Sequence, residues 1–198
     1  MSSNTFAAEP HSVVIGLGLG VHSFSTIDET REGGDGYSQD EVSAAVMFEY
    51  YIEWYFINEL AIGYRNLTLI NNRELYISSE IQIKQEWTIS TSLITLNWVL
   101  YGVNDYTRIG FIGGYGSSEY KITQTVEAEA SSSSKDEFST NGTATLMGIY
   151  VDWGDEGFGA RFGYNALNTS YDKLKDNSRE YEVDASGGAT YFDFRWAF

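Results

Sequence analysis

The chain has 198 residues, a single proline, no cysteine and a formal net charge of −16. The lack of cysteine excludes disulfide frameworks, thiolate zinc sites and cysteine nucleophiles. An acidic surface disfavours nucleic acid as a partner, because nucleic acid binds to basic patches. No run of about 18 apolar residues occurs, so a transmembrane helix is not expected. Fifteen tyrosines and 20 glycines beside one proline favour extended β structure.

Eight segments alternate between apolar residues and residues of other kinds with a period of two, which predicts strands with one apolar face. The clearest covers 13–22, where Val13 and every second residue up to Val21 are apolar, and the intervening positions include Gly16, Gly18 and Gly20. The other predicted strands lie at 42–56, 60–65, 94–101, 108–116, 147–153, 158–164 and 192–198.

The connections between these strands alternate in length. Short turns follow the second, fourth and sixth strands, and long polar segments at about 27–41, 68–87, 119–142 and 166–187 follow the first, third, fifth and seventh. This arrangement is typical of outer-membrane barrels. The sequence therefore predicts an all-β chain, a single domain folded as an eight-stranded antiparallel up-and-down transmembrane β-barrel with four long outer loops. Residues 1–11 are expected to form an N-terminal extension, and Met1–Pro10 resembles a processed start or a tag remnant.

Two of the long segments have distinct compositions. The segment 68–87 has an alternation of its own at 80–84, so the strands that flank it can extend above the membrane. The segment 119–142 contains four consecutive serines at 131–134 and scattered acidic residues, which predicts a mobile, low-complexity loop.

The apolar face could point into a soluble barrel or outward into lipid, and the tryptophans favour lipid. Trp54, Trp98 and Trp153 each precede a short turn and Trp196 precedes the C-terminus, so all four are expected at one end of an up-and-down barrel. Tryptophan prefers the membrane–water interface, where its ring is buried and its N–H stays hydrated. These four residues are therefore predicted to form a membrane-interface girdle, and Trp87 is a candidate for the opposite girdle.

The charged residues within strands share the other face. An arginine in the middle of the bilayer costs about 2–4 kcal/mol, whereas the glycines on this face leave room for long side chains in a narrow lumen. Neighbouring strands could bring Glu49 close to Arg65, and Asp152 diagonally close to Arg161. The sequence thus predicts a lumen ion-pair network, which either plugs the barrel or gates a small pore, formed by Glu49, Glu53, Arg65, Arg108, Asp152, Arg161, Asp193 and Arg195.

The C-terminal sequence 190–198 resembles the outer-membrane insertion signal, with Phe192, Phe194 and Trp196 in phase with a terminal Phe198. The stretches 48–65 and 96–115 resemble the second to fifth strands of small OmpA-, OmpX- and OmpW-type barrels. This resemblance implies a porin-like barrel of the Gram-negative outer membrane that contacts outer-membrane lipid and lipopolysaccharide and is recognised by the barrel assembly machinery. A monomer is expected. The resemblance does not extend to the loops.

The expected function is non-enzymatic: a barrel that displays acidic surface loops for envelope integrity or adhesion to a surface partner. Candidate contacts in the last loop are Tyr171, Lys173, Lys175, Arg179 and Tyr181. One alternative is a low-conductance pore for ions or small solutes.

The other alternative is a lipid A-modifying enzyme. His22 and Ser23 are adjacent, but neighbouring strand residues point to opposite faces and cannot form a dyad by themselves. No cofactor is expected. No metal site is expected either, because the first acidic loop matches no calcium-binding spacing, although it contains Asp28, Glu29, Glu32, Asp35, Asp40 and Glu41.

Overall fold

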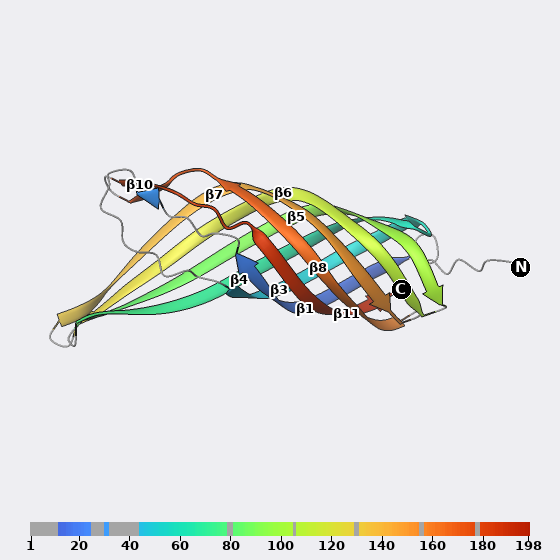
Figure 1. Ribbon diagram of the computed structural model, residues 1–198, viewed down its shortest axis with the longest axis horizontal. Coiled ribbons are helices and arrows are strands. Elements are labelled where there is room, and N and C mark those ends of the chain that lie inside the picture. The colour runs from blue at the N-terminus through green and yellow to red at the C-terminus, as the bar shows by residue number, and fades with distance from the viewer. Residues whose placement is uncertain are drawn as a thin grey trace, which may run out of the picture.

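The computed structural model describes residues 12–24, 30–31, 44–78, 81–104, 106–128, 131–154, 157–176 and 179–198. Eight antiparallel strands form a closed barrel in the order β1-β11-β8-β7-β6-β5-β4-β3, and β3 pairs with β1 to close the ring (Figure 1). The fold class predicted from the sequence is confirmed. The strands are β1 (Val13–Phe24), β3 (Ala44–Ile57), β4 (Leu60–Ser78), β5 (Ile81–Asn104), β6 (Thr107–Ala128), β7 (Ser131–Trp153), β8 (Gly157–Tyr171) and β11 (Gly187–Ala197).

The strands are staggered around the barrel. A path of directly paired residues that starts at Val14 and passes once around all eight strands returns to β1 at Phe24, ten residues farther along. A stagger of this size tilts the strands, and eight tilted strands enclose an interior that side chains can fill. Residues that are far apart in the pairing can therefore lie at the same height in the lumen.

The apolar face of each strand forms the outer wall. On β3, Phe48 and Ile52 point outward and are about half exposed, whereas Glu49 and Glu53 are buried inside. Leu17 on β1 is 64% exposed. The alternative of a soluble barrel with its apolar face inside is therefore wrong. None of the described residues belongs to a helix with the length and hydropathy needed to cross a bilayer.

Strands β4 to β7 continue far beyond the others at the end opposite the C-terminus (Figure 1). Most of the predicted loop at 68–87 is strand, because β4 and β5 continue to Ser78 and Ile81, so the extension expected from the alternation at 80–84 is confirmed. The predicted loop at 119–142 is wrong for most of its length, because β6 and β7 continue to Ala128 and Ser131. The four-serine stretch belongs to β7 and is not a loop. Backbone ladder bonds hold these extensions together, and such bonds require no apolar alternation in the sequence.

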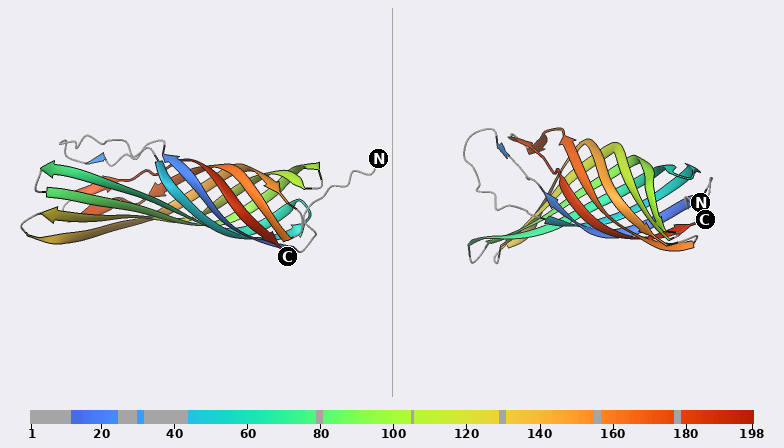
Figure 2. Two further views of the ribbon diagram at one scale, coloured as in Figure 1. Left: turned by 90° about the horizontal axis from the view of Figure 1, so that it is seen from below. Right: turned by 45° about the vertical axis from the view of Figure 1, so that its right-hand side comes forward.

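A second, small sheet lies at the same end of the molecule (Figure 2). It contains β2 (Thr30–Arg31), β9 (Leu174–Asp176) and β10 (Arg179–Glu182), so it joins part of the first predicted loop to the last one. The six acidic residues of the first loop and the N-terminal extension 1–11 lie outside the described residues.

Candidate functional site

The candidate site is the half of the lumen nearer to the short turns and the C-terminus, where the charged residues gather. This half is called the inner half, and the half nearer to the projecting strands is called the outer half. All eight residues of the predicted network are less than a tenth exposed, and they come from six strands. Glu49 and Glu53 lie on β3, Arg65 on β4, Arg108 on β6, Asp152 on β7, Arg161 on β8, and Asp193 and Arg195 on β11.

Arg161 is the centre of this network. Its Nη1 lies 2.6 Å from Oε1 of Glu53, and its Nε lies 2.6 Å from Oδ1 of Asp152. Its Nη2 donates a further hydrogen bond to each carboxylate, at 3.0 and 3.1 Å. Asp152 is directly opposite Arg161 in the pairing of β7 with β8, not diagonal to it as predicted. Glu53 is 108 residues away in sequence and reaches Arg161 across the lumen.

Arg65 extends the network from the other side of Glu53. Its Nη1 lies 2.7 Å from Oε2 of Glu49, and its Nη2 lies 3.6 Å from Oε1 of Glu53. Glu53 is therefore shared by two guanidinium groups, which compensates its charge in a region with little water. The pairing places Arg65 opposite Tyr51, so Arg65 and Glu49 meet diagonally.

The other three charged residues border these two clusters. Arg195 donates a hydrogen bond from Nη2 to the carbonyl oxygen of Gly154, at 2.9 Å, and its Nε lies 3.9 Å from Oδ1 of Asp152. Arg108 pairs with Asp152 in the ladder of β6 and β7, and Asp193 pairs with Arg161 in the ladder of β11 and β8. The inner lumen is thus crossed by linked charges of both signs.

The sequence analysis missed the role of the lumen tyrosines. The guanidinium carbon of Arg161 lies 4.0 Å from the ring centroid of Tyr150 and 4.9 Å from that of Tyr51. The guanidinium carbon of Arg65 lies 4.5 Å from the Tyr51 centroid and 5.6 Å from that of Tyr191. Cation–π attraction and ring packing therefore hold both arginines in place. The sequence did contain a signal for this role. Tyr51 is two residues from both Glu49 and Glu53, so the alternation of side chains along β3 places all three on the same face.

Glycines on neighbouring strands make room for these rings. A Cβ added at Gly16 would overlap the ring of Tyr51, one at Gly110 would overlap Tyr150, and one at Gly163 would overlap Tyr191. The glycines on the inner face thus leave space for tyrosine rings as well as for arginines.

Replacing Gly110 by alanine is expected to destabilise the barrel by about 1–3 kcal/mol, because the new methyl group displaces the Tyr150 ring from Arg161. Urea unfolding of the barrel in lipid vesicles, followed by tryptophan fluorescence, measures the change. Gly113→Ala is the matched control on the outer face of the same strand, where an added Cβ makes only an ordinary contact at 3.6 Å with Phe111. Equal stabilities of the two variants would show that Tyr150 does not depend on Gly110.

The outer half of the lumen is mainly apolar. Met47, Leu69, Ile89 and Leu146 belong to a buried cluster there, which also includes Val183 and Ala185 from the segment between β10 and β11. The backbone N–H of Ala185 donates to Oγ1 of Thr169 at 3.2 Å, and that of Thr169 donates to Oγ of Ser186 at 3.0 Å. These bonds hold residues 183–186 against the outer end of the lumen.

Three earlier expectations concern this outer half. Trp87 belongs to the buried cluster, so the prediction that it is part of the opposite girdle is wrong. Trp87 and Trp98 are eleven residues apart on β5, and because side chains alternate along a strand, an odd separation places them on opposite faces. The prediction that Tyr171 contacts a surface partner is also wrong, because its hydroxyl lies 2.8 Å from Oγ of Ser118 and its ring packs against Tyr120. His22 is fully buried and Ser23 is exposed.

The remaining candidate contacts are only partly described. Lys173 is exposed, and the side chains of Lys175, Arg179 and Tyr181 lie outside the described residues.

The outer wall carries the two remaining sets of predicted residues. Trp54, Trp98, Trp153 and Trp196 all point outward at the end of the barrel that has the short turns. Phe192, Phe194 and Trp196 of β11, which pairs with β1, are also exposed, as is the terminal Phe198. Phe158 of β8 packs against Phe194 and Trp196, with ring centroids 5.7 and 6.0 Å apart.

A closed eight-stranded barrel with an apolar outer wall and a charged, filled lumen defines the class of small transmembrane barrels of the bacterial outer membrane. No family model and no curated protein matches the chain. Solved structures do. One is Ail of Yersinia pestis in complex with the heparin analogue sucrose octasulfate, at 14% identity over 96% of this chain and 99% of that chain, with a TM-score of 0.53. Another is OprG of Pseudomonas aeruginosa, at 15% identity over 97% and 98%, with a TM-score of 0.54. These structures share the fold of this chain, which agrees with the predicted eight-stranded barrel.

Proposed function

We propose that this barrel is a non-enzymatic surface protein that binds a partner through the sheet of β4 to β7 that projects beyond the barrel rim. The supporting observation is the pairing at the rim. β4 pairs with β3 only as far as Ile70 but continues to Ser78, and β7 begins at Ser131 but pairs with β8 only from Gly142. Beyond these points, within the described part of the chain, the four strands form ladders only with one another (Figure 2).

Among the described residues, no strand pairs with β4 beyond Ile70 or with β7 before Gly142, so these two strands are the edges of the projecting sheet. An edge strand presents unpaired N–H and C=O groups, and a strand of another protein can add to them. The β7 edge is partly occupied near the barrel, where the N–H of Asp172 donates to the carbonyl oxygen of Asn141. The β4 edge beyond Ile70 is the better candidate for strand addition.

The chemistry of the partner follows from charge. Ail is seen with a sulfated heparin analogue, but a chain with a net charge of −16 repels polyanions at long range. A protein segment that adds as a strand gains its affinity from backbone hydrogen bonds and does not need a basic surface. We therefore propose that the partner is a protein on the surface of a host cell or a neighbouring cell, and not a sulfated polysaccharide.

The lumen supports this proposal over the pore and enzyme alternatives. Arg161 joins Glu53 to Asp152 across the inner half, and residues 183–186 pack against the outer half. His22 lies inside the wall and Ser23 outside it, so these two side chains are not arranged as a catalytic pair. We infer that the girdle tryptophans and the C-terminal aromatic residues serve membrane anchoring and assembly.

The protein is expressed in a bacterial strain that does not adhere by itself. Shortening both projecting hairpins is expected to abolish most of the adherence that the unaltered protein gives this strain. An Asn-Gly turn would join Asn72 to Glu86 and Thr123 to Glu137, which are directly opposite pairs, so the register of the remaining barrel is kept. The measurement counts bacteria bound to a monolayer of cultured epithelial cells. The faster gel mobility of the unboiled protein verifies that the shortened barrel still folds.

Variants with only one shortened hairpin serve as matched controls. Loss of adherence in the β4–β5 variant alone would locate binding at the β4 edge. Full adherence of the doubly shortened barrel, or no adherence of the unaltered chain above the host background, would contradict the proposal.

A further inference from the structure

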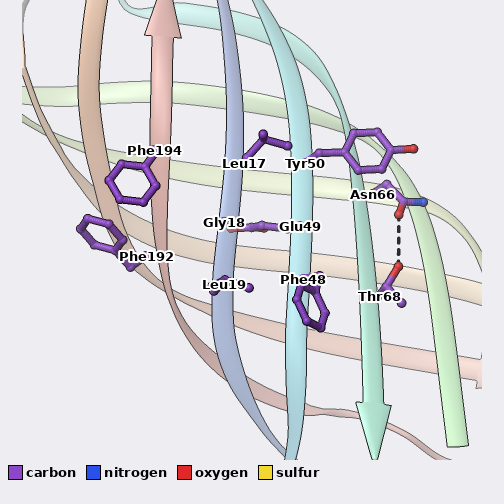
Figure 3. Close-up of a pocket in the computed structure, with 10 residues that line it drawn as sticks. All are labelled: Leu17, Gly18, Leu19, Phe48, Glu49, Tyr50, Asn66, Thr68, Phe192 and Phe194. Atoms are coloured by element: carbon purple, nitrogen blue, oxygen red, sulfur yellow. Dashed lines mark hydrogen bonds between the residues drawn. The ribbon is translucent and has the colours of Figure 1, made fainter.

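Two acidic side chains of the lumen meet at the seam where the first strand, β1, pairs with the last one, β11. Gly18 of β1 is directly opposite Asp193 of β11 on one side and Glu49 of β3 on the other. Gly18 and Glu49 lie side by side in Figure 3. A Cβ added at Gly18 would overlap Oδ1 of Asp193 and would lie 3.1 Å from Cγ of Glu49. Because Gly18 has no side chain, the two carboxyl groups reach over it and come within hydrogen-bonding distance of each other.

Asp193 lacks a nitrogen or hydroxyl donor for its carboxyl group. Its side chain is fully buried, and among the described residues no such donor forms a hydrogen bond to either of its carboxyl oxygens. Arg161 is directly opposite Asp193 on β8, but its guanidinium group donates four hydrogen bonds to Glu53 and Asp152. The arginine that the strand pairing places beside Asp193 is therefore already engaged by two other carboxylates.

The other groups around Asp193 do not supply a donor either. Arg65 donates from Nη1 to Glu49, at 2.7 Å. The hydroxyl groups of Tyr51 and Tyr191 form no hydrogen bond within the described part of the chain, and the inner face of β1 is glycine at this level. The titratable and charged groups that face Asp193 are, strand by strand, Glu49 and Tyr51 of β3, Arg65 of β4, Arg161 of β8, and Tyr191 and Arg195 of β11.

A buried carboxylate without a donor is costly, and a second carboxylate in contact with it adds to the cost. A proton on one of the two removes a negative charge and forms a hydrogen bond from that carboxyl group to the other. We propose that Asp193 and Glu49 share one proton at neutral pH, and that this proton makes the closure of the barrel sensitive to pH. Glu49 is the acceptor, because Arg65 balances its charge. When the pH is raised the proton leaves, and two negative charges then repel each other across β1.

Proton binding fixes the sign of the effect on stability. An exposed aspartate of the unfolded chain is ionised above about pH 4, whereas the folded barrel keeps the shared proton. The folded barrel therefore binds one more proton than the unfolded chain, and its stability falls as the pH rises. The unfolding equilibrium constant increases about tenfold for each pH unit until the pair loses its proton. His22 and the remaining titratable groups add slopes of their own, so the slope of the pair is obtained as the difference between two proteins.

Asp193→Asn supplies the comparison, because asparagine has the shape of aspartate and carries no charge. Urea unfolding in lipid vesicles is measured for both proteins at about pH 5, 6 and 7, above the range in which exposed carboxyl groups titrate. The unfolding equilibrium constant of the unaltered barrel is expected to rise about tenfold per pH unit relative to that of the variant. Asp152→Asn is the matched control. The carboxyl group of Asp152 is also buried, but its Oδ1 lies 2.6 Å from Nε of Arg161, so Asp152 is charged in both states and its difference from the unaltered barrel stays constant with pH.

Infrared spectroscopy of the folded barrels at neutral pH gives a second readout that does not depend on stability. The carbonyl stretch of a protonated carboxyl group is separate from the bands of a carboxylate. This stretch is expected in the unaltered barrel and in Asp152→Asn. It is expected to be absent from Asp193→Asn, and from Glu49→Gln because Arg65 is then free to balance the charge of Asp193.

Absence of the stretch from the unaltered barrel would overturn the inference, and so would a stability difference between the unaltered barrel and Asp193→Asn that does not change with pH. None of these variants alters the projecting sheet, so both results are independent of the adherence experiment.

Discussion

Replacing Arg161 by methionine is expected to destabilise the folded barrel by about 3–5 kcal/mol, because it leaves the buried carboxylates of Glu53 and Asp152 without their shared partner. Arg161 makes four hydrogen bonds of 2.6 to 3.1 Å to these two groups, and its side chain is fully buried. Methionine fills a similar length of the lumen, so most of the loss comes from the uncompensated charges. Urea titration of the barrel in lipid vesicles measures the change in the free energy of unfolding.

Two controls separate buried charge from ion pairing in general. Lys121 forms a 2.7 Å ion pair with Glu137 on the projecting sheet, but their side chains are 39% and 53% exposed. Lys121→Gln is therefore expected to cost less than about 1 kcal/mol. Adding Glu53→Gln and Asp152→Asn to Arg161→Met removes the unpaired charges and is expected to restore part of the stability. If Arg161→Met costs no more than Lys121→Gln, the lumen network does not hold the barrel together.

The same proteins show whether the lumen conducts ions. In planar bilayers the unaltered barrel is expected to give no steady current, because linked side chains cross the inner half of the lumen and residues 183–186 pack against the outer half. A steady current through the unaltered barrel, with Arg161→Met changing its size, would favour the alternative of a small pore.

Replacing Ile149 by arginine is the second change with a large expected effect, a destabilisation of about 2–4 kcal/mol. Ile149 is 60% exposed on the outer face of β7, four residues from Trp153 of the girdle, and Phe111 and Tyr164 lie opposite it on the neighbouring strands. An arginine there must face hydrocarbon or bend toward the interface. Urea unfolding in lipid vesicles again provides the measurement.

Asn141→Arg is the matched control, because Asn141 is exposed on the same face of the same strand, eight residues closer to the tip of the hairpin. Near or beyond the interface an arginine is expected to cost at most about 1 kcal/mol. A cost at Asn141 equal to that at Ile149 would mean that the outer wall near Ile149 is not covered by lipid.

Alternation at period two was sufficient to predict the barrel and the direction of its side chains. The strand containing Glu49 and Glu53 points these acids inward and points Phe48, Tyr50, Trp54 and Phe56 outward, as expected. The prediction works because a side chain in a strand can point to only one of two faces of the barrel wall. The lipid outside requires apolar side chains, whereas the narrow lumen can hold charged ones. The girdle prediction for Trp87 did not apply this alternation, and it failed.

The extended hairpins were only partly predictable. Serine, lysine and glutamate around Lys121 and Glu137 resemble loop residues in composition, yet they continue the ladders of β6 and β7. Outside the bilayer no apolar face is needed, so the pattern that identifies membrane strands disappears while the backbone pairing continues.

The sequence by itself determined the fold class, the membrane-facing residues and the set of charges in the lumen, because each depends on local alternation. Neighbouring strands also allowed the Glu49–Arg65 and Asp152–Arg161 pairs to be predicted, and both are present. Only the tertiary structure decided which charges meet across the lumen. The ten-residue stagger brings Glu53 and Arg161 together across the lumen. This arrangement depends on the closure and tilt of the whole barrel, which no single strand specifies.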